Sequence, residues 1–354
     1  MITRTSVIAA IVVSTAIVQT HAQEQKLPVW KQRRSALDRN LVVDEFRIYY
    51  TLSGEDALPD AVDSNGNSIP DRIDNIALQL TTARDIFNDV LKLRPPLESP
   101  RYKGDAKFID IHVGSPPFAP GEAKTTGSAG DAAVNYYRHT DPEDGVRVLS
   151  IDIMNTLPVK NVTPAHELFH LYQYGYSMFK VAWYTEGTAR WIQYTLDEGS
   201  GQPKGVPLAP ADLEKLFTMK YEAEGFWSTL GHAADARGQL KLTRKMRSVR
   251  YIGTNEPVVR DAEFHGGLFV KQLLEAMDAA DDKASADRKL DPLFWKEDQQ
   301  RSADNNPYMW AAVVDVSRKY SRRSPAVRAM VQRLSPEAQP CERDIWSRFS
   351  AQQS

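Results

Sequence analysis

A short stretch near the middle of the chain places two histidines and a glutamate at a spacing suited to metal chemistry. It reads Thr163-Pro-Ala-His-Glu-Leu-Phe-His-Leu-Tyr-Gln-Tyr-Gly-Tyr176, with His166, Glu167 and His170 at its centre. On a helix, residues four apart lie roughly 6 Å from each other, so both imidazoles project from one face. In this H-E-x-x-H pattern the histidines bind zinc and the glutamate activates a water on the metal. We therefore predict a catalytic zinc site with Glu167 as general base.

Local signals favour the helix that this site requires. Thr163 is suited to the N-cap, Pro164 fits the first helical position, and Gly175 can close the far end. The apolar positions around the motif leave the His/Glu stripe between core and solvent, as in a helix that borders a cleft. Two ordinary histidines on a buried helix are the alternative interpretation, which the motif and its helical context disfavour.

A catalytic zinc ion needs a third protein ligand and one open position for water. The metzincin continuation of the motif fails, because position 173 is Gln and position 176 is Tyr. We predict Glu186 as the third ligand, on a second helix that packs against the first. A carboxylate stabilised by the dipole at a helix N-terminus is the alternative for Glu186. In that case His232 or His265 would be the remaining histidine candidates downstream.

The motif H-E-x-x-H followed by E-G-x-A-x-W resembles the gluzincin class of zinc metallopeptidases. The closest resemblance is to secreted bacterial metallopeptidases with an Asn-Gly and Pro-Asp loop upstream, and it covers roughly residues 41–195. It implies that His166, His170 and Glu186 bind zinc. Two features depart from thermolysin-like members. Only fifteen residues separate His170 from Glu186, and Arg190 replaces an aspartate that orients a zinc-binding histidine.

The segment Asp63-Ser-Asn-Gly-Asn-Ser-Ile-Pro-Asp-Arg-Ile-Asp74 predicts a calcium loop. Calcium takes six to eight oxygen ligands, and suitable groups fall at loop positions 1, 3, 5, 7, 9 and 12. These are the side chains of Asp63, Asn65, Asn67, Asp71 and Asp74 and the backbone carbonyl of Ile69. Ser68 stands where EF-hands have glycine, and the Ile-Pro-Asp part resembles thrombospondin type 3 repeats. An Asn/Asp-rich turn that caps the next helix is the alternative.

Composition bounds the remaining possibilities. The 354 residues are 42% hydrophobic and 25% charged with a net charge of -2, which indicates a globular protein and no nucleic-acid partner. Residues 1–22 read as a signal peptide, so we expect a secreted or periplasmic protein without a stable membrane anchor. Cys341 is the only cysteine, which excludes an internal disulfide.

The order of the expected elements predicts an α+β fold. Strands are expected at 41–52, 107–113 and 146–153, with a helix over 71–91 and the zinc helix after the last strand. We predict a zincin-like lobe over residues 23–200, with a mixed sheet and the active-site helix. A mainly helical C-terminal lobe over 201–354 would close the cleft.

These features together predict an exported zinc metallopeptidase that cleaves peptide or protein substrates. Transition-state stabilisation needs a donor near the developing oxyanion, for which Tyr184 and His265 are candidates. Hydrolysis of a non-peptide amide by the same residues is one alternative. A calcium-stabilised surface or binding protein with a structural or inactive zinc site is another, and the intact Glu167 argues against it.

Overall fold

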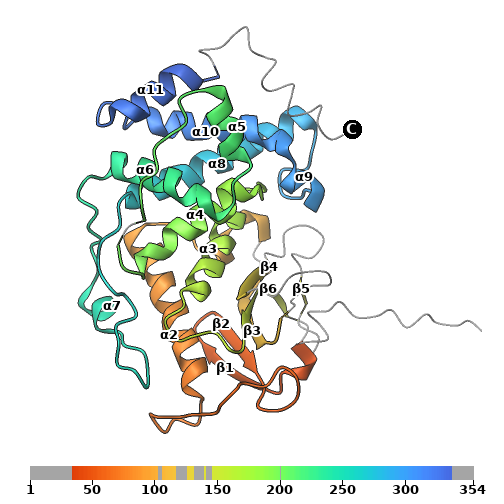
Figure 1. The fold of residues 1–354 in the computed structure, drawn as a ribbon. Coiled ribbons are helices and arrows are strands. Elements are labelled where there is room, and N and C mark those ends of the chain that lie inside the picture. Colours follow the sequence, from red (N-terminus) through yellow and green to blue (C-terminus); the bar gives the residue numbers. More distant parts are fainter. Residues whose placement is uncertain are drawn as a thin grey trace, which may run out of the picture.

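The computed structural model describes residues 34–102, 106–116, 126–130, 139–140, 146–199 and 201–336. The expected signal peptide and Cys341 lie outside these ranges. The described residues form an α+β structure, as predicted, with one sheet at one end and helices stacked above it (Figure 1). No helix within them is both long and apolar enough to cross a membrane.

The sheet is mixed, with the order β1-β2-β3-β6-β4. Its strands are β1 (Arg39–Val43), β2 (Phe46–Tyr50), β3 (Phe108–Gly114), β4 (Gly127–Gly130), β5 (His139–Thr140) and β6 (Arg147–Met154). The central strands β2, β3 and β6 are parallel, and β1 is antiparallel to β2. Both β4 and β5 pair antiparallel with β6.

Helices account for most of the remaining regular structure. They are α2 (Asp71–Asp85), α3 (Thr163–Tyr176), α4 (Ala182–Ile192), α5 (Pro210–Phe217), α6 (Glu224–Ala234), α7 (Arg244–Ser248), α8 (Gly267–Arg288), α9 (Glu297–Arg301), α10 (Asn306–Arg318) and α11 (Pro325–Leu334). A π-helix, η1 (Ile86–Val90), extends α2, and short 3-10 helices are η2 (Pro96–Glu98), η3 (Pro100–Tyr102), η4 (Gln193–Thr195), η5 (Tyr221–Ala223) and η6 (Ala303–Asn305). Residues 201–336 contain helices and turns but no strand.

The segment predicted as one strand over 41–52 is a β-hairpin. Asp44 has a φ of 52°, in the left-handed region that Asp tolerates better than most residues. The chain therefore reverses at this residue, and Val43 pairs with Phe46 across the hairpin. The prediction of a single strand was wrong because this turn contains no glycine or proline to mark it.

The motif helix α3 spans the predicted residues, but the residues that cap its two ends differ from the prediction. Val162 occupies the cap position, so the prediction of Thr163 as N-cap was wrong. The side chain of Asn161 instead accepts hydrogen bonds from the backbone N–H and the hydroxyl of Thr163, at 2.9 and 2.7 Å. Gly175 lies inside the last turn, and the helix ends before Ser177 in extended backbone.

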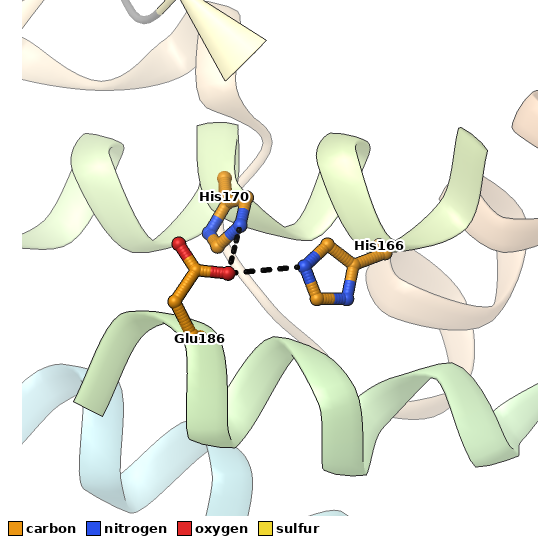
Figure 2. Close-up of side chains that lie close together, drawn as sticks. All are labelled: His166, His170 and Glu186. Carbon is orange, nitrogen blue, oxygen red and sulfur yellow. Dashed lines mark ion pairs between the residues drawn. The ribbon is translucent and has the colours of Figure 1, made fainter. Parts of the chain in front are cut away.

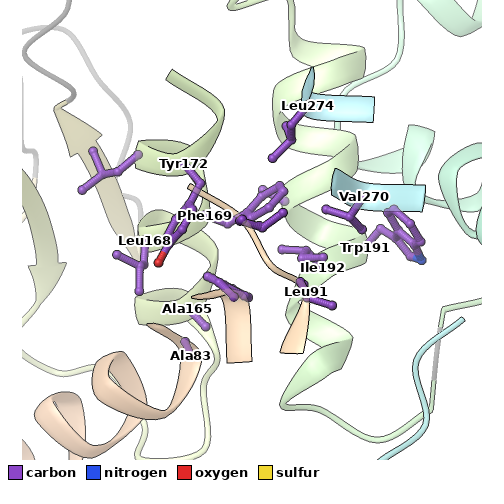
Figure 3. Packing of buried hydrophobic residues seen from close by; sticks show 14 of the residues in the cluster. Ala83, Leu91, Ala165, Leu168, Phe169, Tyr172, Trp191, Ile192, Val270 and Leu274 are labelled. Carbon is purple, nitrogen blue, oxygen red and sulfur yellow. The ribbon is translucent and has the colours of Figure 1, made fainter. Parts of the chain in front are cut away.

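Helix α3 lies at the centre of the hydrophobic core (Figure 3). Its apolar side chains pack against α2, α4 and α8, and those labelled in the figure are Ala83, Leu91, Ala165, Leu168, Phe169, Tyr172, Trp191, Ile192, Val270 and Leu274. Each large apolar side chain buried in this way contributes roughly 1.5–3 kcal/mol. Since this cluster includes residues on both sides of position 200, the proposed boundary between two lobes stays a prediction.

A buried ion pair joins the end of α3 to α8. The guanidinium of Arg101, in η3, contacts the carboxylate of Asp281, and their side chains are 4% and 0% exposed. Arg101 also donates to the carbonyl of Tyr176 at 2.7 Å, while the backbone N–H of Met178 donates to Asp281 at 3.0 Å. The segment that follows the motif helix is therefore held by charge-assisted hydrogen bonds.

Removal of Asp281 is predicted to destabilise the fold strongly. Asp281→Ala would leave the buried Arg101 guanidinium with only the longer contact, 3.4 Å, to the partly exposed carboxylate of Asp278, and loss of a buried partner typically costs about 3–5 kcal/mol. The free energy of unfolding in urea measures this loss. Lys283→Ala on the same helix removes an exposed pair with Asp287 and is expected to change stability little. A loss no larger for Asp281→Ala than for this control would contradict the anchoring role.

Candidate metal centre

Helices α3 and α4 bring the three predicted zinc ligands to one point (Figure 2). The Nε2 atoms of His166 and His170 lie 3.5 and 3.6 Å from the same Oε2 atom of Glu186. The two imidazoles are nearly perpendicular, with centroids 4.8 Å apart. One ligand atom from each residue lies within 4.8 Å of the others, and no further group of this kind occurs in the described part of the chain. This group could hold a metal ion.

Glutamine side chains orient both histidines. Gln173 Oε1 lies 2.7 Å from the Nδ1 atom of His170, and Gln193 Oε1 lies 3.3 Å from that of His166. The Nε2 atom of Gln173 donates to the carbonyl of Thr185, so its oxygen must face the imidazole. An oxygen there accepts a hydrogen bond from Nδ1–H and leaves the Nε2 lone pair for a cation. The donor set and its orientation therefore fit zinc.

Loss of Gln173 is predicted to weaken metal binding. Gln173→Ala removes the acceptor that orients His170, and such partners typically contribute 10–100-fold to metal affinity. Competition with a chelator measures this change, with the melting temperature as a check on folding. The matched variant Gln193→Ala removes a longer hydrogen bond, so a smaller loss is expected. Wild-type affinity in folded Gln173→Ala would contradict this role.

The charges of Glu186 and His170 stabilise each other. Burial alone would lower the pKa of His170, but the negative charges of Glu186 and Glu167 and hydrogen bonds to Glu186 and Gln173 raise it to about 9. Burial alone would raise the pKa of the Glu186 carboxyl, but His170 and His166 hold it well below its ordinary value. With this pKa, His170 carries a proton at neutral pH, and a metal ion that binds there must displace it.

Metal affinity is therefore predicted to fall as the pH is lowered. Because the folded-state pKa of His170 is about 9, a metal ion binding below that pH must displace its proton. One displaced proton gives roughly a tenfold weaker affinity for each pH unit between 8 and 6. Calorimetry in two buffers with different ionisation enthalpies measures the proton release. Equal affinity at pH 6 and pH 8 would rule out this competition.

The predicted base, Glu167, is buried beside the triad under strand β4. Burial raises the pKa of its carboxyl, while the charges of His166 and His170 act in the opposite direction. A Cβ on Gly127 would lie 2.9 Å from Cγ of Glu167 and 2.6 Å from Cγ2 of Thr163. The absence of a side chain at Gly127 therefore lets the edge strand pass directly over the base.

A cavity of about 370 Å³ opens beside His166 and Glu167. Tyr221 and Arg190 both line it, and neither was predicted as a site residue. The Tyr221 ring lies 6.0 Å from that of His166. Burial, the charges of Glu186 and Glu167 and a hydrogen bond to Glu186 raise the pKa of its hydroxyl. No sequence signal marked Tyr221, because it comes from a separate 3-10 turn 35 residues after Glu186.

Neither candidate oxyanion donor from the sequence lines this cavity. Tyr184 is fully buried, and His265 stacks on His232 with ring centroids 3.8 Å apart. The two histidines considered as alternatives to Glu186 therefore contact each other. Glu186 is the residue whose carboxylate the structure places against the motif histidines.

Gly187 allows the turn that carries Tyr221 to approach α4. A Cβ at this position would lie 2.7 Å from Cβ of Ala223 and 2.9 Å from the indole nitrogen of Trp227. Trp227 stacks on Trp183 at 5.4 Å and donates to its carbonyl at 2.9 Å. Gly187 thus faces η5 and α6 rather than α3.

The predicted calcium loop is a compact turn before α2. Asp63 accepts hydrogen bonds from the backbone N–H groups of Gly66, Asn67 and Ser68. The side chains of Asn65 and Asn67 donate to Asp74 at 3.1 and 2.9 Å, and Asp71 accepts from Ser64. Ile69 donates its N–H to the Asn67 side chain. Protein groups thus donate hydrogen bonds to the carboxylates of Asp63, Asp71 and Asp74, and calcium at this loop stays a prediction.

No family model, curated protein or solved structure matches the chain. The function must therefore be argued from the residues and geometry of the site.

Proposed function

We propose that this protein is a zinc-dependent metallopeptidase. The observation that carries the proposal is the convergence of His166, His170 and Glu186 beside a buried Glu167 at an open cavity. Three protein ligands leave a coordination position for water, which is the arrangement of catalytic rather than structural zinc. The α+β frame, with a mixed sheet beside the motif helix, supports a zincin-like lobe.

In this proposal, each residue at the cavity has a defined task. Zinc would polarise the scissile carbonyl and lower the pKa of a bound water. Glu167 accepts a proton from the attacking water and passes it to the leaving amine. The hydroxyl of the water becomes part of the new carboxyl group. A carboxyl whose pKa burial raises is suited to both transfers. Tyr221 lines the cavity beside His166, and its hydroxyl would donate to the oxyanion that develops on the carbonyl oxygen.

The expected signal peptide extends the proposal to an exported enzyme that acts on peptides or proteins outside the cytoplasm. Calcium at residues 63–74 would stabilise the start of α2 in this setting. The competing proposals are hydrolysis of a non-peptide amide by the same residues and a binding protein whose zinc site is structural. The role of Glu167 separates them, because a structural zinc site has no use for a base.

Glu167→Gln is predicted to abolish turnover while the fold and the metal are retained. The amide has nearly the shape of the carboxylate but cannot accept the proton, so the rate should fall by at least about 10²-fold. Digestion of a diverse peptide mixture, read by mass spectrometry, compares this variant with the mature wild-type protein. Metal analysis of both samples is the control for an intact site.

The outcomes of this comparison separate the competing proposals. Cleavage by the wild type alone supports the peptidase. Absence of cleavage by both proteins, with zinc bound, favours a non-peptide amide substrate or an inactive site. Equal cleavage by both proteins would show that Glu167 is not the base.

A further inference from the structure

The cavity beside the metal centre has a polar lining. Apart from the motif residues, its side chains include Thr126, Asn161, Gln193, Tyr221 and Arg190, and Val162 is the apolar side chain among those that line it. Apolar cavities select hydrophobic side chains, whereas convergent polar groups select a partner that can hydrogen-bond with them. The lining therefore indicates a polar group on the substrate.

Arg190 is the cation of this lining. It lies on α4 one turn after Glu186, is exposed, and makes no hydrogen bond or ion pair with the residues that the structure describes. Its charge nevertheless reaches the hydroxyl of Tyr221, whose pKa it lowers against the larger effects that raise it. Arg47 and Arg101, by contrast, are paired with Asp110 and Asp281.

The charges at the cavity leave Arg190 without a counter-ion. A divalent cation at the triad would balance the two negative charges of Glu186 and Glu167. Asp152, another carboxylate whose charge acts on Glu167, lies 3.1 Å from His112. With a metal ion at the triad, the guanidinium of Arg190 remains an exposed cation on the cavity lining, where an anionic group can pair with it.

From this arrangement we infer that the cavity selects substrates with a carboxylate next to the scissile bond, bound by the guanidinium of Arg190. The planar guanidinium matches a carboxylate through two parallel hydrogen bonds. The carboxylate belongs either to an Asp or Glu side chain or to a free C-terminus. This inference rests on the proposed peptidase function and specifies its substrate class.

Peptide pairs that differ only in charge test the inference. Capped hexapeptides with Asp or Glu at one position are compared with their Asn or Gln counterparts, and each sequence is made with a free and an amidated C-terminus. The wild-type protein is expected to cleave the acidic member of the preferred pair with a kcat/KM about 10- to 100-fold higher. The arm that shows this preference identifies the source of the carboxylate.

Variants of Arg190 then test whether this residue causes the preference for acidic peptides. Arg190→Gln is expected to reduce the ratio between acidic and neutral peptides to near one, and Arg190→Lys to retain part of it, because lysine keeps the charge without the fork. Arg322→Gln, at an exposed position after α10, is the matched control and should keep the full preference. Melting temperatures verify that each variant is folded.

A binding measurement makes the test independent of turnover. Calorimetric titration of zinc-loaded Glu167→Gln protein with the same peptide pairs should show tighter binding of the acidic member. Introduction of Arg190→Gln should remove this difference. If no peptide is cleaved but this Arg190-dependent binding occurs, the carboxylate-binding role of Arg190 stands while the peptidase proposal fails.

Two outcomes overturn the inference while leaving the peptidase proposal intact. One is Glu167-dependent cleavage without an acidic preference. The other is a preference that Arg190→Gln leaves unchanged. Either result would mean that Arg190 is a solvated surface cation.

Discussion

The Nε2 atoms of His166 and His170 and a carboxylate oxygen of Glu186 meet between helices α3 and α4. The arrangement of the site depends on a hydrogen-bond or ionic partner for each of these buried polar groups. A buried polar group without a partner is unfavourable, so each imidazole nitrogen must find one. Gln173 and Gln193 contact the Nδ1 atoms, and Glu186 faces both Nε2 atoms. The raised pKa of His170 and the suitability of the site for a cation have the same cause, which is the negative charge of Glu186 and Glu167.

The surrounding helices and the sheet hold the residues of the candidate site in position. The sheet and α2 pack against α3, and Figure 3 shows its apolar residues beside Ala83 of α2. The histidines of α3 face Glu186 on α4 (Figure 2). The stacked pair Trp183 and Trp227 joins α4 to α6, and Gly187 leaves the space through which η5 brings Tyr221 to the cavity. The position of the hydroxyl thus depends on packing far from the metal ligands.

The sequence predicted the parts of the site that local spacing determines. His166 and His170 follow from helical periodicity, and Glu186 follows from the need for a third ligand near that helix. Tyr221 and the partner of Arg101 could not be predicted, because they arise from contacts between segments distant in the chain. Gln173 was noted only as a departure from the metzincin pattern. The hairpin at Asp44 was missed because its turn lacks the residues that usually mark one.

The contact between Arg101 and Asp281 spans 180 residues of chain. Such distant contacts form only after a large loop has closed, and they place much of the ordering late in folding. During synthesis the motif helix is complete long before α8 exists to anchor its end. A nascent chain therefore carries His166, Glu167 and His170 well before the contact that anchors the end of α3 can form. In the exported enzyme that we propose, this delay would itself limit premature activity.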